Sequence, residues 1–177
     1  MEQTSKKSEQ KPDREDLTGE HPLGDAGQII IAVLFFGVWI LDTSFLHYTT
    51  FLTSHVPWFV RIPAGLLLLF YALYLARTGL KTVFDEVRPQ PRVIREGVFR
   101  RVRHPIYSSE LLTYTGLLIL HFSAMAFLVW LTAAGFLYFI SRHEERLLTE
   151  RFGEEYRNYI QEVPMLIPRI KVKKIRK

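Results

Sequence analysis

The chain has 177 residues, which is room for one ordinary domain. Its residues are 48% apolar and 14% aromatic, and this composition excludes a chain that is disordered throughout. Cysteine is absent, which excludes disulfides and cysteine metal sites, and the net charge of +5 would suit either a nucleic acid or an anionic membrane surface.

The amino-terminal part of the chain divides into a polar tail and a membrane domain. Residues 1–26 carry many charges and few large apolar side chains, so we predict a disordered cytoplasmic tail, followed by a single membrane domain at 27–177. The first two spans are predicted at 28–46 and 58–76, where windows of 19 residues each hold one charge. Such windows match the roughly 20 residues that cross a bilayer. We therefore expect a lipid bilayer, and no nucleic acid, as the partner.

A third apolar window covers residues 106–140 with a single charge. As one helix it would be about 52 Å long, which is too long for one crossing without a steep tilt. We therefore predict a tight hairpin of two short spans at 106–121 and 123–140. An amphipathic cytoplasmic helix is expected to follow at 141–160, because apolar side chains recur there at helical spacing. The predicted fold is an all-α integral membrane protein with about four transmembrane helices.

The basic residues predict the orientation of these spans. Four Lys and Arg residues precede the first span, eight lie in residues 77–103 and ten in residues 142–177, and none lies in residues 48–57 or at the hairpin tip. The positive-inside rule then places both termini and the middle loop in the cytoplasm. The compact build favours a bacterial inner membrane.

Two polar clusters flank the predicted hairpin, one at residues 97–107 and one at residues 141–164. A hairpin returns both clusters to one membrane face, where Arg and His donors would meet a Glu pair among aromatic rings. This set suits a zwitterionic, partly aromatic ligand, with a carboxylate on Arg or His, an ammonium or hydroxyls on Glu, and a flat base on the rings. No zinc motif, Walker A sequence or G-x-G-x-x-G is present, so no metal site or Rossmann nucleotide site is expected.

The combined motifs resemble those of a known enzyme family. R-H-P-x-Y at residues 103–107 is followed, after the hairpin, by E-E-x-x-L, F-G-x-x-Y-x-x-Y and V-P. Over residues 84–168 this order is similar to the isoprenylcysteine carboxyl methyltransferase family, whose wider group includes the membrane phospholipid methyltransferases. The resemblance implies an integral-membrane enzyme that uses S-adenosylmethionine, bound outside any Rossmann fold. It would transfer a methyl group to a lipidic or small hydrophobic acceptor that enters from the bilayer.

The resemblance also implies the site residues. Cofactor-binding residues would be Val93, Ile94, Phe99, Arg103, His104, Pro105, Tyr107, Glu144 and Glu145. Arg142 matches a substrate-facing arginine and is one candidate catalytic residue. Glu110, inside the membrane one turn past Pro105, is a second candidate, as an acid or base on the acceptor side. We interpret the aromatic side chains Phe152, Tyr156 and Tyr159 as interfacial or packing residues.

Several alternatives stay open at this stage. Phe99 stands where the family commonly has tyrosine, and this missing hydroxyl, together with the basic tail, would also fit a non-catalytic membrane adaptor or a lipid-headgroup-binding protein. The acceptor can be a carboxylate, a thiol or an amine, and prenylcysteine is not established as the substrate. No pattern specifies the oligomeric state.

Overall fold

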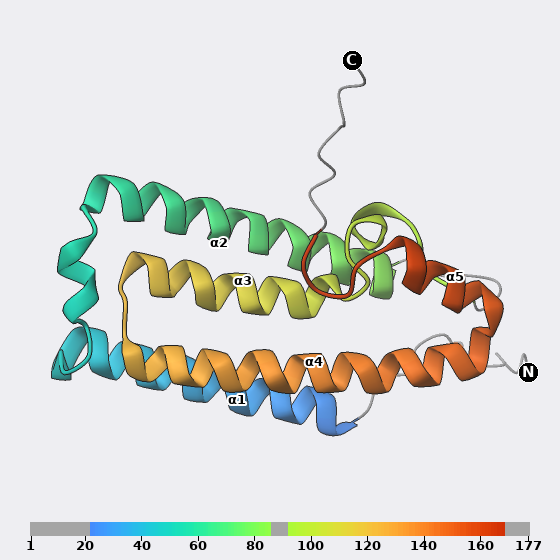
Figure 1. The fold of residues 1–177 in the computed structure, drawn as a ribbon, viewed down its shortest axis with the longest axis horizontal. Coiled ribbons are helices and arrows are strands. Elements are labelled where there is room, and N and C mark those ends of the chain that lie inside the picture. Colours follow the sequence, from blue (N-terminus) through green and yellow to red (C-terminus); the bar gives the residue numbers. More distant parts are fainter. Residues whose placement is uncertain (1–21, 86–91, 169–177) are drawn as a thin grey trace, which may run out of the picture.

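A computed structural model describes residues 22–85 and 92–168, and the regular structure within these two ranges is entirely helical. The long helices are α1 (Pro22–Leu41), α2 (Trp58–Leu80), α3 (Pro105–Leu120) and α4 (Ala124–Phe152). The shorter ones are η2 (Asp42–Leu46), η3 (Phe51–His55), η4 (Lys81–Asp85), η5 (Gly97–Arg100) and α5 (Glu154–Glu162). The long helices follow the long axis of the molecule, with η3 at one end and η5 and α5 at the other (Figure 1).

The predicted hairpin is present in the structure. Helix α3 ends at Leu120, and Ser123 caps the next helix by accepting a hydrogen bond from the backbone N–H of Ala126 at 3.1 Å. At its other end α3 begins with Pro105, whose fixed φ suits the first position of a helix. The first helix begins at Pro22, within the predicted tail, and the remainder of that tail lies outside the described residues.

The predicted boundary between a span at 123–140 and a separate helix at 141–160 is wrong. Helix α4 continues without a break to Phe152, because no glycine or proline interrupts residues 136–152. The break comes at Gly153, whose φ of 56° lies in the left-handed region that favours glycine. The polar cluster of residues 141–145 is therefore carried on the same rigid helix as the apolar part of α4.

The apolar helices fit a lipid environment. Within the described residues, three helical stretches are long and apolar enough to span a membrane: Ala26–Leu46, Trp58–Val83 and Ala124–Phe152. Only 17% to 28% of their apolar windows is buried inside the protein, so most of their large side chains need an apolar surrounding. Helix α3 has 16 residues, or about 24 Å, which is shorter than the hydrocarbon core. The count of four crossings therefore stays a prediction.

Helix packing brings α3 to the centre of the bundle. Gly65 of α2 faces Gly116 of α3, and a Cβ on either glycine would lie within 3.1 Å of the other's carbonyl oxygen. This absence of side chains lets α2 and α3 approach closely. On the other side of α3, Tyr114 stacks on Phe35 of α1 with ring centroids 4.1 Å apart. Packing against α2, α1 and α4 therefore fixes the position of α3, and with it the position of His104 at its start.

Candidate functional site

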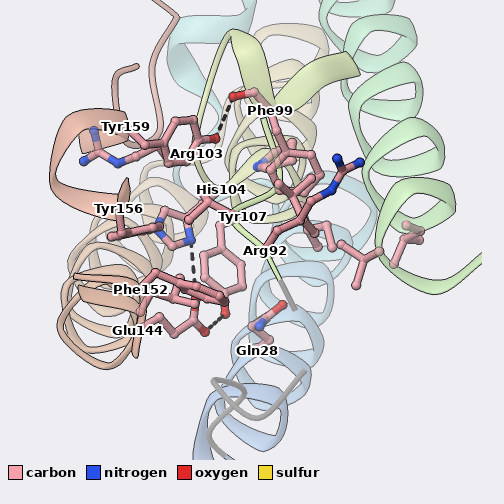
Figure 2. A pocket seen from close by; sticks show the side chains of 17 residues that line it. Gln28, Arg92, Phe99, Arg103, His104, Tyr107, Glu144, Phe152, Tyr156 and Tyr159 are labelled. Carbon is pink, nitrogen blue, oxygen red and sulfur yellow. Dashed lines mark hydrogen bonds and ion pairs between the residues drawn. The ribbon is translucent and has the colours of Figure 1, made fainter. Parts of the chain in front are cut away.

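A cavity of about 370 Å³ lies at the end of the bundle that carries η5 and α5 (Figures 1 and 2). This volume falls within the range of about 300–1,000 Å³ that is usual for small-molecule sites. Its walls come from all five α-helices, from η4 and η5, and from the segments on either side of η5. They are formed by Gln28, Leu80, Val83, Arg92, Val93, Ile94, Phe99, Arg103, His104, Pro105, Ile106, Tyr107, Glu144, Leu148, Phe152, Tyr156 and Tyr159.

The two polar clusters meet in this cavity. His104 precedes α3, and its Nδ1 lies 3.3 Å from Oε2 of Glu144, while its Nε2 lies 3.4 Å from Oε1 of Glu145. The Tyr107 hydroxyl donates a hydrogen bond to Glu144, and the Tyr107 ring stacks on the His104 ring at a centroid distance of 5.5 Å. Figure 2 shows the side chains of His104, Tyr107 and Glu144 converging from the start of α3 and from α4. Residues about forty positions apart in the sequence thus form one polar corner.

The corner favours a positively charged His104. Burial by itself disfavours the charged ring, but the contacts with Glu144 and Glu145 and their negative charges outweigh it and raise the pKa of His104 above its ordinary value. The Nε2 atom is buried and makes no well-formed hydrogen bond within the protein. Its nearest polar neighbour is Oε1 of Glu145 at 3.4 Å.

The two glutamates of the pair have different surroundings. Glu144 lines the cavity, with 12% of its side chain exposed. Glu145, with 3% exposed, points away from the lining and accepts a hydrogen bond from Nε of buried Arg103 at 2.6 Å. Of the two carboxylates, Glu144 is therefore the one that a ligand in the cavity can reach.

The loop before α3 supplies the opposite wall. Val93, Ile94 and Phe99 all line the cavity, with Val93 and Phe99 buried. The carbonyl oxygen of Phe99 accepts a hydrogen bond of 2.6 Å from the hydroxyl of Tyr159, which attaches this loop to α5. Arg92 also lines the cavity, and its exposed guanidinium forms an ion pair of 2.5 Å with Glu96.

The structure does not bring the two candidate catalytic residues into the cavity. The Arg142 side chain is 62% exposed and lies 3.9 Å from Oε2 of Glu145, outside the cavity lining. Glu110 also lies outside the lining, and accepts a hydrogen bond of 2.6 Å from the Tyr114 hydroxyl one turn further along α3. Eight of the nine predicted cofactor-binding residues line the cavity, and the ninth, Glu145, lies outside the lining.

Several lining residues were not predicted. Phe152, Tyr156 and Tyr159 form part of the wall, although their pattern was interpreted as interfacial or packing. The F-G-x-x-Y-x-x-Y motif contains all three and could have identified them. Gln28 reaches the cavity from α1, and no local sequence signal marks it, because it sits at the edge of an apolar window.

The lining can serve a zwitterionic ligand that also carries a flat ring. Glu144 offers an acceptor for a cation or for hydroxyls, His104 and Arg92 offer donors, and Phe99 and Tyr156 offer aromatic faces. Within the described ranges no three His, Asp or Glu side chains are grouped closely enough to hold a metal ion.

Comparison with known proteins gives two matches. The sequence pattern of the family described as phospholipid methyltransferase matches residues 60–155, which include α3, the polar corner and the whole of α4. The chain is also similar to a protein named methanethiol S-methyltransferase from Pseudomonas deceptionensis, at 33% identity over 99 residues. That alignment covers 52% of this chain and 36% of the relative, so the matched part spans about a third of the relative's length. No solved structure matches the chain significantly.

Proposed function

The chain belongs to the phospholipid methyltransferase family, and we propose that it is an integral-membrane enzyme that transfers a methyl group from S-adenosylmethionine to a lipidic or small hydrophobic acceptor. The observation that carries this proposal is the meeting of His104, Tyr107 and Glu144 in one cavity at the end of an apolar helix bundle. Such a cavity combines a zwitterion-binding corner with direct proximity to the bilayer.

The residues present fit this cofactor. S-adenosylmethionine, when bound, would supply an activated methyl group on a sulfonium that carries its own leaving group. Glu144 would hold the ammonium or the ribose hydroxyls, the charged ring of His104 would take a polar group, and Phe99 and Tyr156 would offer surfaces for the adenine. The contribution of the chain is therefore alignment and exclusion of water, and no acid–base pair is required for that task.

The apolar part of the lining supports a hydrophobic acceptor. Leu80, Val83 and Ile106 line the cavity from α2, η4 and α3. We propose that the acceptor arrives along this apolar side from the bilayer. Because the similar Pseudomonas protein is named for methanethiol, small thiols are the first acceptors to test, ahead of lipid amines and isoprenoid carboxylates.

We also propose an orientation in which this end of the bundle faces the cytoplasm of a bacterial inner membrane, with four crossings. The basic residues on either side of the hairpin support it, since Arg100 in η5, Arg101 directly after it and Arg157 in α5 lie at the end that holds the cavity. The cofactor is polar and charged, so it dissolves in water and not in the lipid core. It would reach the cavity from water without crossing lipid.

The test is cofactor binding by purified protein in detergent, measured by calorimetry. We expect Glu144→Gln and His104→Ala each to weaken binding of S-adenosylmethionine by at least about tenfold, because each removes a charge-assisted contact of roughly 1.5–3 kcal/mol. Glu150→Gln is the matched control, since Glu150 is exposed on the same helix and lies outside the cavity lining. Transfer of label from deuterated cofactor to methanethiol or to a membrane extract, followed by mass spectrometry, identifies the acceptor.

Unchanged cofactor affinity in both site variants would contradict the site assignment. A wild-type protein that neither binds the cofactor nor transfers label would contradict the activity itself. The latter result would favour the non-catalytic adaptor or headgroup-binding protein that the sequence left as the alternative.

A further inference from the structure

Arg103 is buried and joins three separate parts of the chain. Its Nε donates to Oε1 of Glu145 on α4 at 2.6 Å. Its Nη1 donates to the carbonyl oxygen of Ile160 in α5 at 2.9 Å, and also to the carbonyl oxygen of Val163. With 7% of its side chain exposed, Arg103 lies beside His104 at the back of the polar corner. These contacts occupy Nε and Nη1 with protein partners.

The segment after α5 runs along the start of α3 and is fastened to it. We call residues 163–166 the closing segment. The backbone N–H groups of Arg103 and His104 donate to the carbonyl oxygens of Pro164 at 2.9 Å and Met165 at 3.1 Å. Further along, the Ser108 hydroxyl donates to the carbonyl of Leu166 at 2.7 Å. Arg103 thus holds the closing segment through both its backbone and its side chain.

Helix α5 depends on this attachment for its position over the cavity. It has nine residues and is joined to α4 only through Gly153, which has a positive φ and no side chain. It nevertheless supplies Tyr156 and Tyr159, both buried, to the cavity wall. A helix this short gains little stability by itself, so tertiary contacts must hold it in place.

The carboxylate of Glu145 depends on Arg103 in the same way. This carboxylate is buried. Its Oε1 accepts a hydrogen bond from the Arg103 guanidinium and lies 3.4 Å from the His104 ring. Removal of one partner from a buried ion pair leaves an uncompensated charge, which is strongly unfavourable. Without Arg103, the cations left near the Glu145 carboxylate would be the His104 ring at 3.4 Å and the exposed guanidinium of Arg142 at 3.9 Å.

We propose that Arg103 is a positioning residue of the methyl-transfer site: it holds Glu145 and the closing segment, and through them it places His104 and the aromatic wall of α5. This inference rests on the proposed function and assigns Arg103 a role apart from direct cofactor contact. Lysine cannot take its place, because Arg103 uses donors on two atoms that point to different partners, whereas the donors of lysine share one nitrogen.

The test uses Arg103→Lys, Arg103→Met and, as a matched control, Arg101→Met, which replaces an exposed arginine two residues away. Affinity for S-adenosylmethionine is measured by calorimetry in detergent from pH 6 to 9, and folding is followed by thermal unfolding. We expect Arg103→Lys to bind about tenfold more weakly while it still unfolds cooperatively, since the contacts with the two carbonyls are lost. Arg101→Met should match the wild type.

The pH profile separates positioning from a purely structural role. The groups that face His104 are Glu144 and Glu145 from α4, Tyr107 from α3 and Arg103 itself. In Arg103→Met the negative charge of Glu145 is no longer offset by Arg103 and stabilises the protonated form of His104 more strongly. The pH at the midpoint of the affinity profile should therefore rise. In Arg103→Lys a cation remains near Glu145, so the midpoint should stay close to that of the wild type.

Each outcome has a defined meaning. Wild-type affinity in Arg103→Lys, or a folded Arg103→Met with an unmoved midpoint, overturns the inference while the proposed function stands. If Arg103→Met does not fold, the affinity of Arg103→Lys decides. If the wild type binds no S-adenosylmethionine, the proposed function fails, and the positioning role fails with it.

Discussion

At the scale of single residues, His104 takes its charge state from two neighbouring carboxylates. The ring is buried, yet the negative charges of Glu144 and Glu145 raise its pKa above the ordinary value. A raised pKa in the folded state means that the fold binds the proton more tightly than the unfolded chain does. The stability of the protein is therefore linked to pH through this residue.

We predict that this contribution to stability is fully present below pH 6.5, the ordinary pKa of histidine, and is lost as the pH rises through the raised pKa of folded His104. The wild-type protein in detergent should therefore unfold at a lower temperature at pH 9 than at pH 6. His104→Gln, which cannot take up the proton, should show a smaller difference between the two. An equal pH dependence in both proteins would mean that His104 does not carry this linkage.

Neighbouring residues on α4 also show how sharply helix phase separates roles. Glu144 lines the cavity, Glu145 is buried against Arg103, and Arg142 is largely exposed on another face. Successive residues of an α-helix point about 100° apart, so a short charged run is spread around the helix. The cluster that appears continuous in the sequence therefore divides into three environments.

At the scale of elements, a close contact with α2 fixes the last turns of α3. Gly65 and Gly116 lie against each other, and a Cβ at Gly65 would come within 2.5 Å of Cγ of Leu120 and 3.0 Å of the Gly116 carbonyl oxygen. The Leu120 side chain can rotate away, whereas the backbone carbonyl cannot. Close approach of the two helix backbones is therefore needed at this point.

We predict that Gly65→Ala destabilises the protein by about 1–3 kcal/mol, the usual range for overpacking in a well-packed interior. Gly135→Ala, on α4, is the matched control, because a Cβ there meets nothing within 4 Å. It should be neutral or slightly stabilising, since alanine is the better helix former. Thermal unfolding of both variants in the same detergent measures the difference, and equal stabilities would contradict the proposed close packing.

At the scale of the whole molecule, the two ends of the bundle differ in character. The far end is closed by the last turn of α1 and by η3. Trp39 of α1 donates to the His121 carbonyl at 2.9 Å, and Thr53 of η3 exchanges hydrogen bonds with the backbone of Phe122. These contacts provide hydrogen-bond partners for backbone groups of the turn between α3 and α4. Because α3 is short, this turn would lie close to the hydrocarbon core, where backbone groups without partners are unfavourable. The opposite end holds the cavity and most of the exposed arginines.

We predict that these two ends lie on opposite sides of the membrane. The chain has no cysteine, so single cysteines can be introduced at exposed positions, Ser54→Cys in η3 and Asn158→Cys in α5. In intact bacterial cells a membrane-impermeant maleimide should label Ser54→Cys, and it should label Asn158→Cys only after the cells are permeabilised. Labelling of both in intact cells would place η3 and α5 on the same side of the membrane. This result would contradict the four-span topology.

Much of this organisation was predictable from local properties of the sequence. Span length and hydropathy identified α1, α2 and the hairpin, because the bilayer thickness sets how many apolar residues a crossing needs. The motifs around His104 and Glu144 identified two clusters, and the hairpin geometry predicted that they would meet. The family match is in accord with the resemblance that those motifs indicated.

Only the tertiary structure decided which of these residues share the cavity. It turned Glu144 toward the cavity and Glu145 toward Arg103, left Arg142 and Glu110 outside, and brought in Gln28 and the rings of α5. The reason is physical: the sequence specifies the type and spacing of side chains along a helix, whereas the face that each one presents depends on how the helix rotates and packs against its neighbours. That packing, set by contacts such as Gly65 against Gly116 and Arg103 against the closing segment, is a property of the whole bundle.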